Sequence, residues 1–259
     1  MSEQSRSTTN DLNLRNILGM RVDPTSYSQV CEQVDKWSSE RIGRYICVAN
    51  VHMTMEAYDD PQYQQVVNQA DLVTPDGMPL VWTLRKMGYK SQQRVYGPTL
   101  TEKVLHLASQ QKISVGFFGS TDAVLEKLVQ KVRQTYPDIE IGYVFSPPFK
   151  ELTKSEDEEF INQINDSGIR VLFVGLGCPK QEKWMHDHRE KVLAVMVGVG
   201  AAFDFIAGVK PQAPDWIQRS GFEWFFRLIT EPKRLWKRYF YNNPRFLYHV
   251  VIQLLRKRK

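Results

Sequence analysis

Apolar and polar positions follow two different patterns along the chain. Short runs of consecutive apolar residues, such as RYICVAN at 44–50 and IRVLFVGLG at 169–177, are typical of strands buried on both faces. Between such runs lie longer segments in which apolar residues recur every three or four positions, as Val124, Leu128 and Val132 do. That spacing is typical of amphipathic helices. The sequence therefore predicts strands and helices that follow one another in turn.

The alternation predicts an α/β fold with a Rossmann-like, mostly parallel sheet covered by helices on both faces. We expect the strands at residues 44–50, 70–77, 113–120, 139–145, 169–177 and 192–200. We expect the helices at about 25–39 (capped by Thr25), 60–69, 80–87, 99–110, 121–135, 155–166 and 179–189. The expected domains are a disordered leader at 1–15, an α/β catalytic domain at 16–208 and a helical appendage at 209–259.

Ligands of open parallel sheets bind beyond the carboxyl ends of the strands. Asn50, Asp76, Gly119, Gly177 and Gly200 all fall at such ends in the predicted sheet. The small residues among them permit close approach of a phosphate or nucleotide, although tight strand-to-helix turns explain them equally well. This edge is where we expect the functional site.

Asp76 has two interpretations. It lies in the stretch LVTPDGMPLVW, where Pro75 presets φ, aspartate bonds to its own backbone and Gly77 takes a positive φ, so a surface turn is the common use of such a sequence. Its place at a strand end, with apolar residues on both sides, instead favours a carboxylate held in a cleft. The local sequence leaves both open.

Composition fits a soluble globular protein. Of the 259 residues, 42% are hydrophobic and 24% are charged, which allows a sizeable core. The three cysteines are an odd number without C-x-x-C spacing, so a disulfide framework or zinc site is not expected and a reducing compartment is. Residues 1–15 are polar and show no secretory signal, and the longest uncharged apolar run, 192–203, falls short of the about 20 residues that span a bilayer.

Positive charge is concentrated at the end of the chain. The net charge is +5, but residues 227–259 alone carry +9 and residues 1–226 carry −4. Aromatic residues gather in the same region, and Leu235, Trp236, Tyr239 and Phe240 follow helical spacing. A nucleic-acid arm and a solvated helix face are alternatives, but a basic amphipathic segment rich in tryptophan and tyrosine best fits a membrane surface. We expect no nucleic-acid partner, because no known binding motif is present.

Cofactor and metal motifs are weak. The segments from Gly175 to Gly177 and from Gly198 to Gly200 match only the first half of G-x-G-x-x-G, so a dinucleotide site has little support. In GLGCPKQEKW, polar residues follow Pro179 at a helix start, which suits either an anion site or a charged surface helix. No Asp-x-Asp pair occurs, and His186 and His188 diverge on a helix, so no metal is expected.

Five segments together closely resemble the WecG/TagA/CpsF family of bacterial glycosyltransferases. They are LVTPDGMPLVW, RVYGP, VGLGCPKQEKW, VGVGAAFDFIAG and PDWIQRSGFEWFFRLITEPKRLWKRY, and the resemblance runs from about Leu18 to Tyr248. It implies an inverting, metal-independent enzyme without a cofactor. Such an enzyme moves a sugar from a UDP-sugar to a polyprenyl-diphosphate-linked saccharide at the cytoplasmic face of the membrane.

The resemblance also implies roles for individual residues. Asp76 matches the proposed general base, which takes the proton of the acceptor hydroxyl. The implied donor pocket consists of Asn50, Arg94, Gly97, Gly177, Gln181 and Gly200. The implied contacts with the lipid diphosphate and an anionic membrane are Arg227, Arg234, Lys237 and Arg238, where Lys237 stands in place of a family arginine.

Three questions stay open at this level. Val48-Ala-Asn50 replaces the family's T-x-N pattern and His52 differs from other members, so the donor sugar is undefined among N-acetylmannosamine, its uronate and glucose. Two other functions remain as alternatives: a nicotinamide-dependent oxidoreductase and a non-catalytic membrane-binding scaffold. A homo-oligomer is compatible with the sequence but is not indicated by it.

Overall fold

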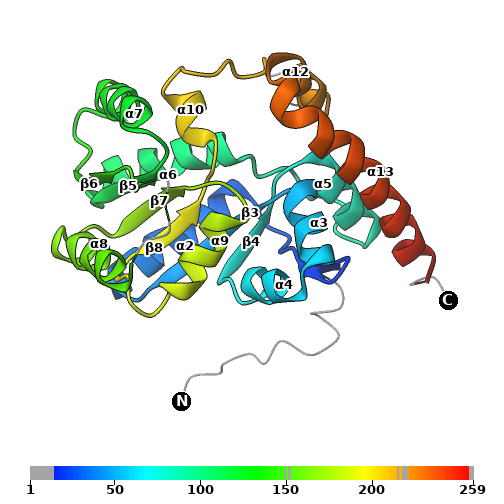
Figure 1. The fold of residues 1–259 in the computed structure, drawn as a ribbon, viewed down its shortest axis with the longest axis horizontal. Helices are drawn as coiled ribbons and strands as arrows, with labels where there is room; N and C mark the ends of the chain where they lie inside the picture. Colours follow the sequence, from blue (N-terminus) through cyan, green and yellow to red (C-terminus); the bar gives the residue numbers. More distant parts are fainter. Residues whose placement is uncertain (1–14, 149, 151–152, 215, 218–220, 257–259) are drawn as a thin grey trace.

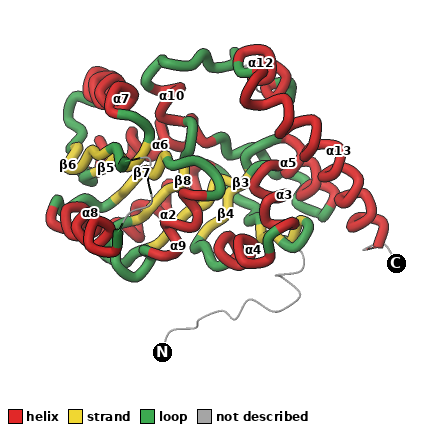
Figure 2. Tube along the Cα trace, in the orientation of Figure 1, coloured by secondary structure: helices red, strands yellow, loops and turns green. Residues whose placement is uncertain are grey.

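The central element is a six-stranded sheet in which every strand pair is parallel (Figures 1 and 2). The computed structural model describes residues 15–148, 150, 153–214, 216–217 and 221–256, so residues 1–14 of the predicted leader lie outside the described ranges. The strands are β1 (Asn16–Ile17), β2 (Met20–Arg21), β3 (Arg44–Ala49), β4 (Leu72–Pro75), β5 (Val115–Gly119), β6 (Ile141–Phe145), β7 (Val171–Gly175) and β8 (Val195–Gly198). The predicted α/β class is confirmed.

Helices follow the strands in the predicted order. They are α2 (Tyr27–Glu40), α3 (Val51–Asp59), α4 (Pro61–Asn68), α5 (Met78–Lys86), α6 (Gly97–Gln111), α7 (Asp122–Thr135), α8 (Lys154–Asp166), α9 (Lys180–Asp187), α10 (Ala202–Ile206), α12 (Glu223–Thr230) and α13 (Pro232–Arg256). The N-cap of α2 is Ser26 and not Thr25, because the Ser26 hydroxyl and the Gln29 side chain form a capping box.

The strand order is β4-β3-β8-β7-β5-β6, with β3 and β8 adjacent inside the sheet. Side chains alternate across the sheet, so Ile46 and Val48 of β3 join the core under α2, α6, α7 and α10, whereas Tyr45 and Cys47 join the core under α3, α4, α9 and α13. The helix after β3 covers one face and the helix after β8 covers the other. This is the topological switch point at which α/β sheets bind ligands.

The N-terminal hairpin and the helices α3 and α10 were not predicted. Residues 16–21 form a short antiparallel hairpin, with Leu18 and Gly19 at positive φ in its turn. Helix α3 follows β3 at once, because the Asn50 side chain accepts a hydrogen bond from the Met53 amide and caps its first turn. The segment VHMTMEAYD is too short and too mixed in its apolar spacing to indicate a helix by pattern alone.

In the described part of the C-terminal region, α12 and α13 close over one end of the sheet, beside α3 and α5 in Figure 1. Leu235, Phe246 and Val250 of α13 are buried, and the last two join the core that contains α3. The side chain of Gln253 bonds to backbone atoms of Leu18 and Asn16 in the N-terminal hairpin. Helix α13 is therefore anchored along its length.

No helix in the described part of the chain combines the length and the apolar character needed to cross a bilayer. Helix α13 has 25 residues but carries lysine and arginine throughout its first half.

Candidate functional site

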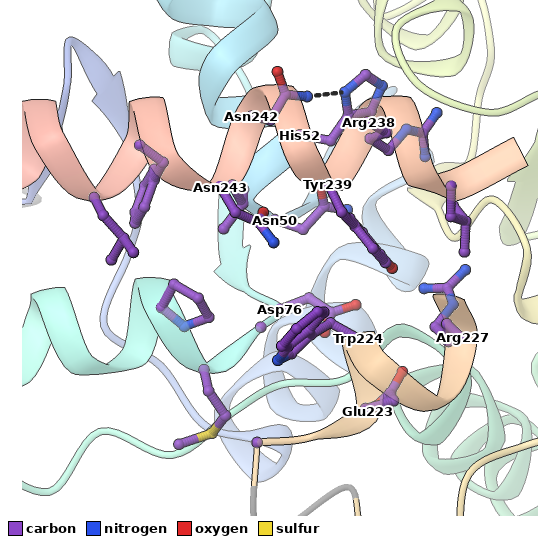
Figure 3. Close-up of a pocket in the computed structure, with 18 of the residues that line it drawn as sticks. Asn50, His52, Asp76, Glu223, Trp224, Arg227, Arg238, Tyr239, Asn242 and Asn243 are labelled. Carbon is purple, nitrogen blue, oxygen red and sulfur yellow. Dashed lines mark hydrogen bonds between the residues drawn. The ribbon is translucent and has the colours of Figure 1, made fainter. Parts of the chain in front are cut away.

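A cavity of about 350 Å³ lies between the carboxyl ends of β3 and β4 and the two C-terminal helices (Figure 3). Its walls combine a polar floor with aromatic and basic side chains from α12 and α13. The lining residues are Asn50, Val51, His52, Asp76, Gly77, Met78, Pro79, Trp82, Arg94, Gly221, Glu223, Trp224, Arg227, Leu235, Arg238, Tyr239, Asn242, Asn243, Phe246 and Leu247. The cavity size suits a small-molecule ligand.

Backbone hydrogen bonds bring Asp76 and Arg94 together. The Asp76 amide donates to the Ala49 carbonyl at 2.6 Å, so the turn after β4 lies against the end of β3. The Val95 amide donates to the Pro75 carbonyl at 2.9 Å and places Arg94 beside that turn. Gly77 has a φ of 111°, a conformation that glycine adopts without strain. The chain therefore bends at Gly77 between β4 and α5, and the Asp76 carboxylate lines the cavity, where it bonds to Arg94 and the Gly97 amide.

Arg94 lies between two carboxylates. Its Nε and Nη2 atoms lie 2.8 Å and 2.7 Å from Asp76 Oδ1, and its Nη1 donates to Glu223 Oε2. Its guanidinium carbon lies 4.1 Å from the ring centroid of Tyr96, a cation–π contact that fixes the orientation of the guanidinium. Burial would lower the pKa of Arg94, but Asp76 and Glu223 raise it above its usual value.

The two oxygens of Asp76 have different environments. Oδ1 accepts both bonds from Arg94, whereas Oδ2 receives one long bond of 3.3 Å from the Gly97 amide. Burial raises the pKa of Asp76; Arg94 and the Gly97 amide oppose this rise and the negative charge of Glu223 adds to it. A carboxylate with a raised pKa and one weakly bonded oxygen is suited to accept a proton.

Two further cations face the cavity. Arg227 comes from α12 and Arg238 from α13, and Figure 3 shows both on the side of the cavity away from Asn243. The Nε atom of Arg227 is buried without a hydrogen-bond partner, and among the described residues neither guanidinium forms an ion pair with a carboxylate. Burial lowers the pKa of Arg238. Uncompensated arginines in a cavity favour an anionic ligand.

Amides and one neutral imidazole form another wall. His52, near the start of α3, bonds to Asn242 of α13 over 3.2 Å, the contact drawn as a dashed line in Figure 3. Burial and the nearby charge of Arg238 lower the pKa of His52 to about 4, so the imidazole is neutral at pH 7. Asn50 caps α3 through its oxygen and also lines the cavity.

The predicted site residues fall into three places. Asn50, Asp76, Arg94, Arg227 and Arg238 line the cavity, and Gly97 lies beside Asp76. Gly177, Gln181 and Gly200 form a neighbouring cluster at the ends of β7 and β8. There, buried Gln181 accepts a bond from the Gly177 amide, donates to Glu182 and packs beside Gly200. Arg234 and Lys237 are exposed on α13 and do not line the cavity.

Several lining residues were not predicted from the sequence. They include His52, Glu223, Trp224, Tyr239, Asn242 and Asn243, of which all but His52 come from the C-terminal helices. One signal existed for Glu223, because it is an acidic residue inside the aromatic stretch GFEWFF and such a carboxylate needs a buried cation.

Within the described ranges, no three histidine, cysteine, aspartate or glutamate side chains gather into a group that could hold a metal ion. The ionisable groups of the cavity are instead arranged as carboxylates around Arg94 and as cations on the C-terminal helices.

The fold and the cavity define a ligand-binding α/β protein with its site at the carboxyl ends of the strands. A family model described as the glycosyl transferase WecG/TagA/CpsF family matches residues 15–259. The chain belongs to this family of glycosyltransferases, as the sequence motifs predicted. This membership excludes the oxidoreductase and scaffold alternatives.

Named relatives match most of the chain. The protein is 32% identical over 223 residues to the N-acetylglucosaminyldiphosphoundecaprenol N-acetyl-beta-D-mannosaminyltransferase of Bacillus spizizenii, which covers 84% of this chain and 82% of the relative. It is 30% identical to the Bacillus subtilis enzyme of the same name, over 87% of this chain and 85% of the relative. The enzyme of that name from Staphylococcus aureus is 27% identical, over 97% of this chain and 96% of the relative.

Proposed function

We propose that the protein transfers a hexose or N-acetylhexosamine-type sugar from a UDP-sugar to a polyprenyl-diphosphate-linked saccharide. The transfer would be a step in the synthesis of a surface polysaccharide or a teichoic-acid-type polymer. The names of the relatives support an acceptor that carries N-acetylglucosamine on a lipid diphosphate. The observation that carries the proposal is Asp76 in the floor of the cavity, with Oδ1 held by Arg94 and Oδ2 weakly bonded.

The proposed reaction is a single displacement with inversion at the anomeric carbon. The hydroxyl oxygen of the acceptor attacks the anomeric carbon as the bond from that carbon to the UDP oxygen breaks. The hydroxyl proton passes to Asp76 Oδ2, and the electron pair of the broken bond leaves with UDP. Because the base has to be ionised, the rate should fall as the pH drops through the raised pKa of Asp76.

Arg227 and Arg238 are the proposed partners of diphosphate groups. Their guanidiniums carry no carboxylate partner among the described residues and open onto the same cavity as Asp76. Two arginines can supply positive charge that other transferases obtain from a divalent ion. We therefore propose that the transfer needs neither a metal nor another cofactor.

The direct test is a transfer assay on the purified protein with a synthetic N-acetylglucosamine-diphosphate lipid. Four donors would be supplied in turn: UDP-N-acetylmannosamine, its uronate, UDP-glucose and UDP-N-acetylglucosamine. The mass of the lipid product would be measured by mass spectrometry. We expect one donor to add one sugar mass, with equal release of UDP and no loss of rate in EDTA. Failure of every UDP-sugar to yield product would contradict the proposed donor class, and loss of the rate in EDTA would contradict metal independence.

A substitution of Arg227 tests the diphosphate contact. Arg227→Gln should raise the KM for the lipid-diphosphate acceptor about 10- to 100-fold, the effect of one charge-assisted hydrogen bond, with a smaller change in kcat. Steady-state kinetics with the acceptor varied would measure it. Arg245→Gln is the matched control, because Arg245 pairs with Asp59 on the surface and does not line the cavity. Equal KM values for both variants would place the diphosphate elsewhere.

The C-terminal helices also provide a surface suited to a membrane. Their exposed apolar side chains are Phe222, Trp224, Phe225, Ile229, Trp236, Phe240, Tyr241, Leu247, Tyr248, Val251 and Leu255. Lys233, Arg234 and Lys237 are exposed among them. Apolar burial combined with basic side chains attracts a helix to anionic lipids. We propose that the protein binds peripherally to the cytoplasmic face of the cell membrane through this surface, with Arg234 and Lys237 toward the headgroups.

The membrane surface is best tested by substitution, because deleting α13 would also remove the buried side chains of Leu235, Phe246 and Val250. The double variant Trp236→Ser and Phe240→Ser should bind phosphatidylglycerol vesicles at least about tenfold more weakly, since less apolar area enters the lipid. Vesicle sedimentation would measure this. Leu193→Ser is the control, because Leu193 is exposed just before β8, at the amino ends of the strands and away from α12 and α13. Unchanged sedimentation of the double variant would exclude these side chains from the contact.

A further inference from the structure

Glu223 is a buried carboxylate in the cavity wall for which the proposed displacement has no use. It is the first residue of α12, its side chain is 6% exposed, and its partner is Arg94. Arg94 lies 129 residues earlier in the chain, so this contact joins the C-terminal helices to the arginine that holds Asp76. Figure 3 shows Glu223 on the α12 segment below Arg227, on the same side of the cavity as Asp76.

We propose that Glu223 is a positioning residue of the transfer reaction: by sharing the guanidinium of Arg94 with Asp76, it keeps Asp76 basic enough to take the acceptor proton. The inference rests on the proposed function of Asp76 as the base. It assigns the C-terminal helices a part in the chemistry, in addition to any part in lipid binding.

The physical reason is the balance of charge around Arg94. A guanidinium paired with Asp76 alone would stabilise the ionised carboxylate and make it a weak base. Glu223 accepts from Nη1 and places a second negative charge on the same cation, so two carboxylates share one positive charge. The negative charge of Glu223 accordingly acts to raise the pKa of Asp76.

The position of the guanidinium depends on the same contact. Arg94 is held by Asp76 on one edge, by Glu223 on another and by the ring of Tyr96 on its face. Both Nε and Nη2 point to Oδ1 of Asp76, which leaves Oδ2 for the proton. Without Glu223, Nη1 of Arg94 has no carboxylate partner among the described residues. The guanidinium can then rotate about its contact with Asp76 Oδ1.

Other charged or titratable groups lie around Asp76 and Glu223, and substitution of Glu223 leaves them unchanged. The groups that interact with Asp76 or face it across the cavity are Tyr27, His52, Arg94, Tyr96, Arg227, Arg238 and Tyr239. Of these, His52 is neutral at pH 7, and burial raises the pKa values of the three tyrosines, so none of these four side chains adds charge there.

The decisive variant is Glu223→Gln, which keeps the size of the side chain and an oxygen for Arg94 but removes the charge. We expect the acidic limb of the kcat/KM profile to move to lower pH, because loss of a nearby negative charge favours ionised Asp76. We expect kcat on the plateau to fall between about threefold and thirtyfold, because a weaker base transfers the proton less readily. The KM values of both substrates should stay near those of the unmodified protein.

Two companion variants separate this role from a merely structural one. Glu223→Asp retains the charge and should leave the acidic limb close to its original pH. Glu231→Gln removes a charge from the other end of α12, where Glu231 pairs with Lys210 and Arg234 outside the cavity lining, and should not move the limb. Thermal unfolding of each variant would confirm that it is folded at the assay temperature.

Each alternative outcome is decisive. The inference is overturned if the acidic limb of the kcat/KM profile of Glu223→Gln stays at its original pH. It is also overturned if the limb of Glu231→Gln shifts as far as that of Glu223→Gln. Complete loss of transfer in folded Glu223→Gln also overturns it, because Glu223 would then itself be the base. The proposed function fails separately: if Asp76→Asn keeps its activity, Asp76 is not the base, whereas an inactive Asp76→Asn with an unmoved limb in Glu223→Gln defeats only the role of Glu223.

Discussion

Replacement of Asp76 by asparagine is expected to lower kcat for sugar transfer by about 100-fold to 10,000-fold, the range that a positioned general base contributes. The amide of asparagine has nearly the shape of the carboxylate and can still accept a bond from Arg94, but it cannot take the proton of the acceptor hydroxyl. The residual rate should lose the acidic limb of its pH profile, since the group that titrates there is gone.

The fold of the Asp76→Asn variant should survive. The turn is held by backbone bonds from the Asp76 amide to Ala49 and from the Val95 amide to Pro75, and neither involves the carboxylate. Arg94 keeps its contact with Glu223. Circular dichroism and calorimetric titration with UDP would check that the folded protein still binds nucleotide, and stopped assays would measure transfer. Turnover close to that of the unmodified protein would rule out Asp76 as the base.

Replacement of Arg94 by methionine is expected to cause the largest loss of stability among these variants. Methionine retains much of the packing against Tyr96 but leaves Asp76 and Glu223 buried together without their shared cation. Removal of one partner from a buried ion pair costs about 3–5 kcal/mol. We expect a loss of this size in the free energy of unfolding at pH 8, together with loss of transfer.

The loss in free energy of unfolding that Arg94→Met causes should become smaller as the pH is lowered from 8 to 5. Without Arg94, the two buried carboxylates have lost their shared cation, so burial and mutual repulsion favour protonation of the pair in the folded state. The folded state then binds more protons than the unfolded state, so its relative stability increases as the pH falls. Urea unfolding of the variant and the unmodified protein at both pH values would measure the difference.

A surface pair provides the control for this experiment. Arg245→Met breaks the exposed contact with Asp59 and should cost no more than about 1 kcal/mol at pH 8. If Arg94→Met costs equally little, or if its deficit is the same at pH 5 and pH 8, the two carboxylates do not depend on Arg94 in the way described.

The sheet was predictable because local chemistry determines it. Uninterrupted apolar runs such as 169–177 indicate strands that are buried on both faces of a sheet. In the helices between them, apolar residues recur every three or four positions, which the sequence shows directly. Helix α3 escaped prediction because its first turn depends on the Asn50 cap, a contact that the apolar pattern does not reveal. In the C-terminal region, Leu235 and Phe246 are buried but Trp236 and Phe240 are exposed, and composition alone does not separate these pairs.

Resemblance to a family predicted more of the site than residue chemistry did. Asp76, Arg94 and Asn50 are placed in the cavity by strand ends and motifs that can be found in the sequence. Gln181 was predicted for the donor pocket and lies in the adjacent cluster at the ends of β7 and β8. Glu223 was missed, because its importance arises from a cation that is 129 residues away.

The sequence by itself determined the α/β class, the turn that presents Asp76 and the concentration of basic and aromatic residues at the end of the chain. Only the tertiary structure decided that α12 and α13 close over the strand ends and place Glu223 against Arg94. The reason is physical. Hydrophobic periodicity and turn propensity are local properties, whereas a buried charge is stabilised by partners from any part of the chain, and the fold selects those partners.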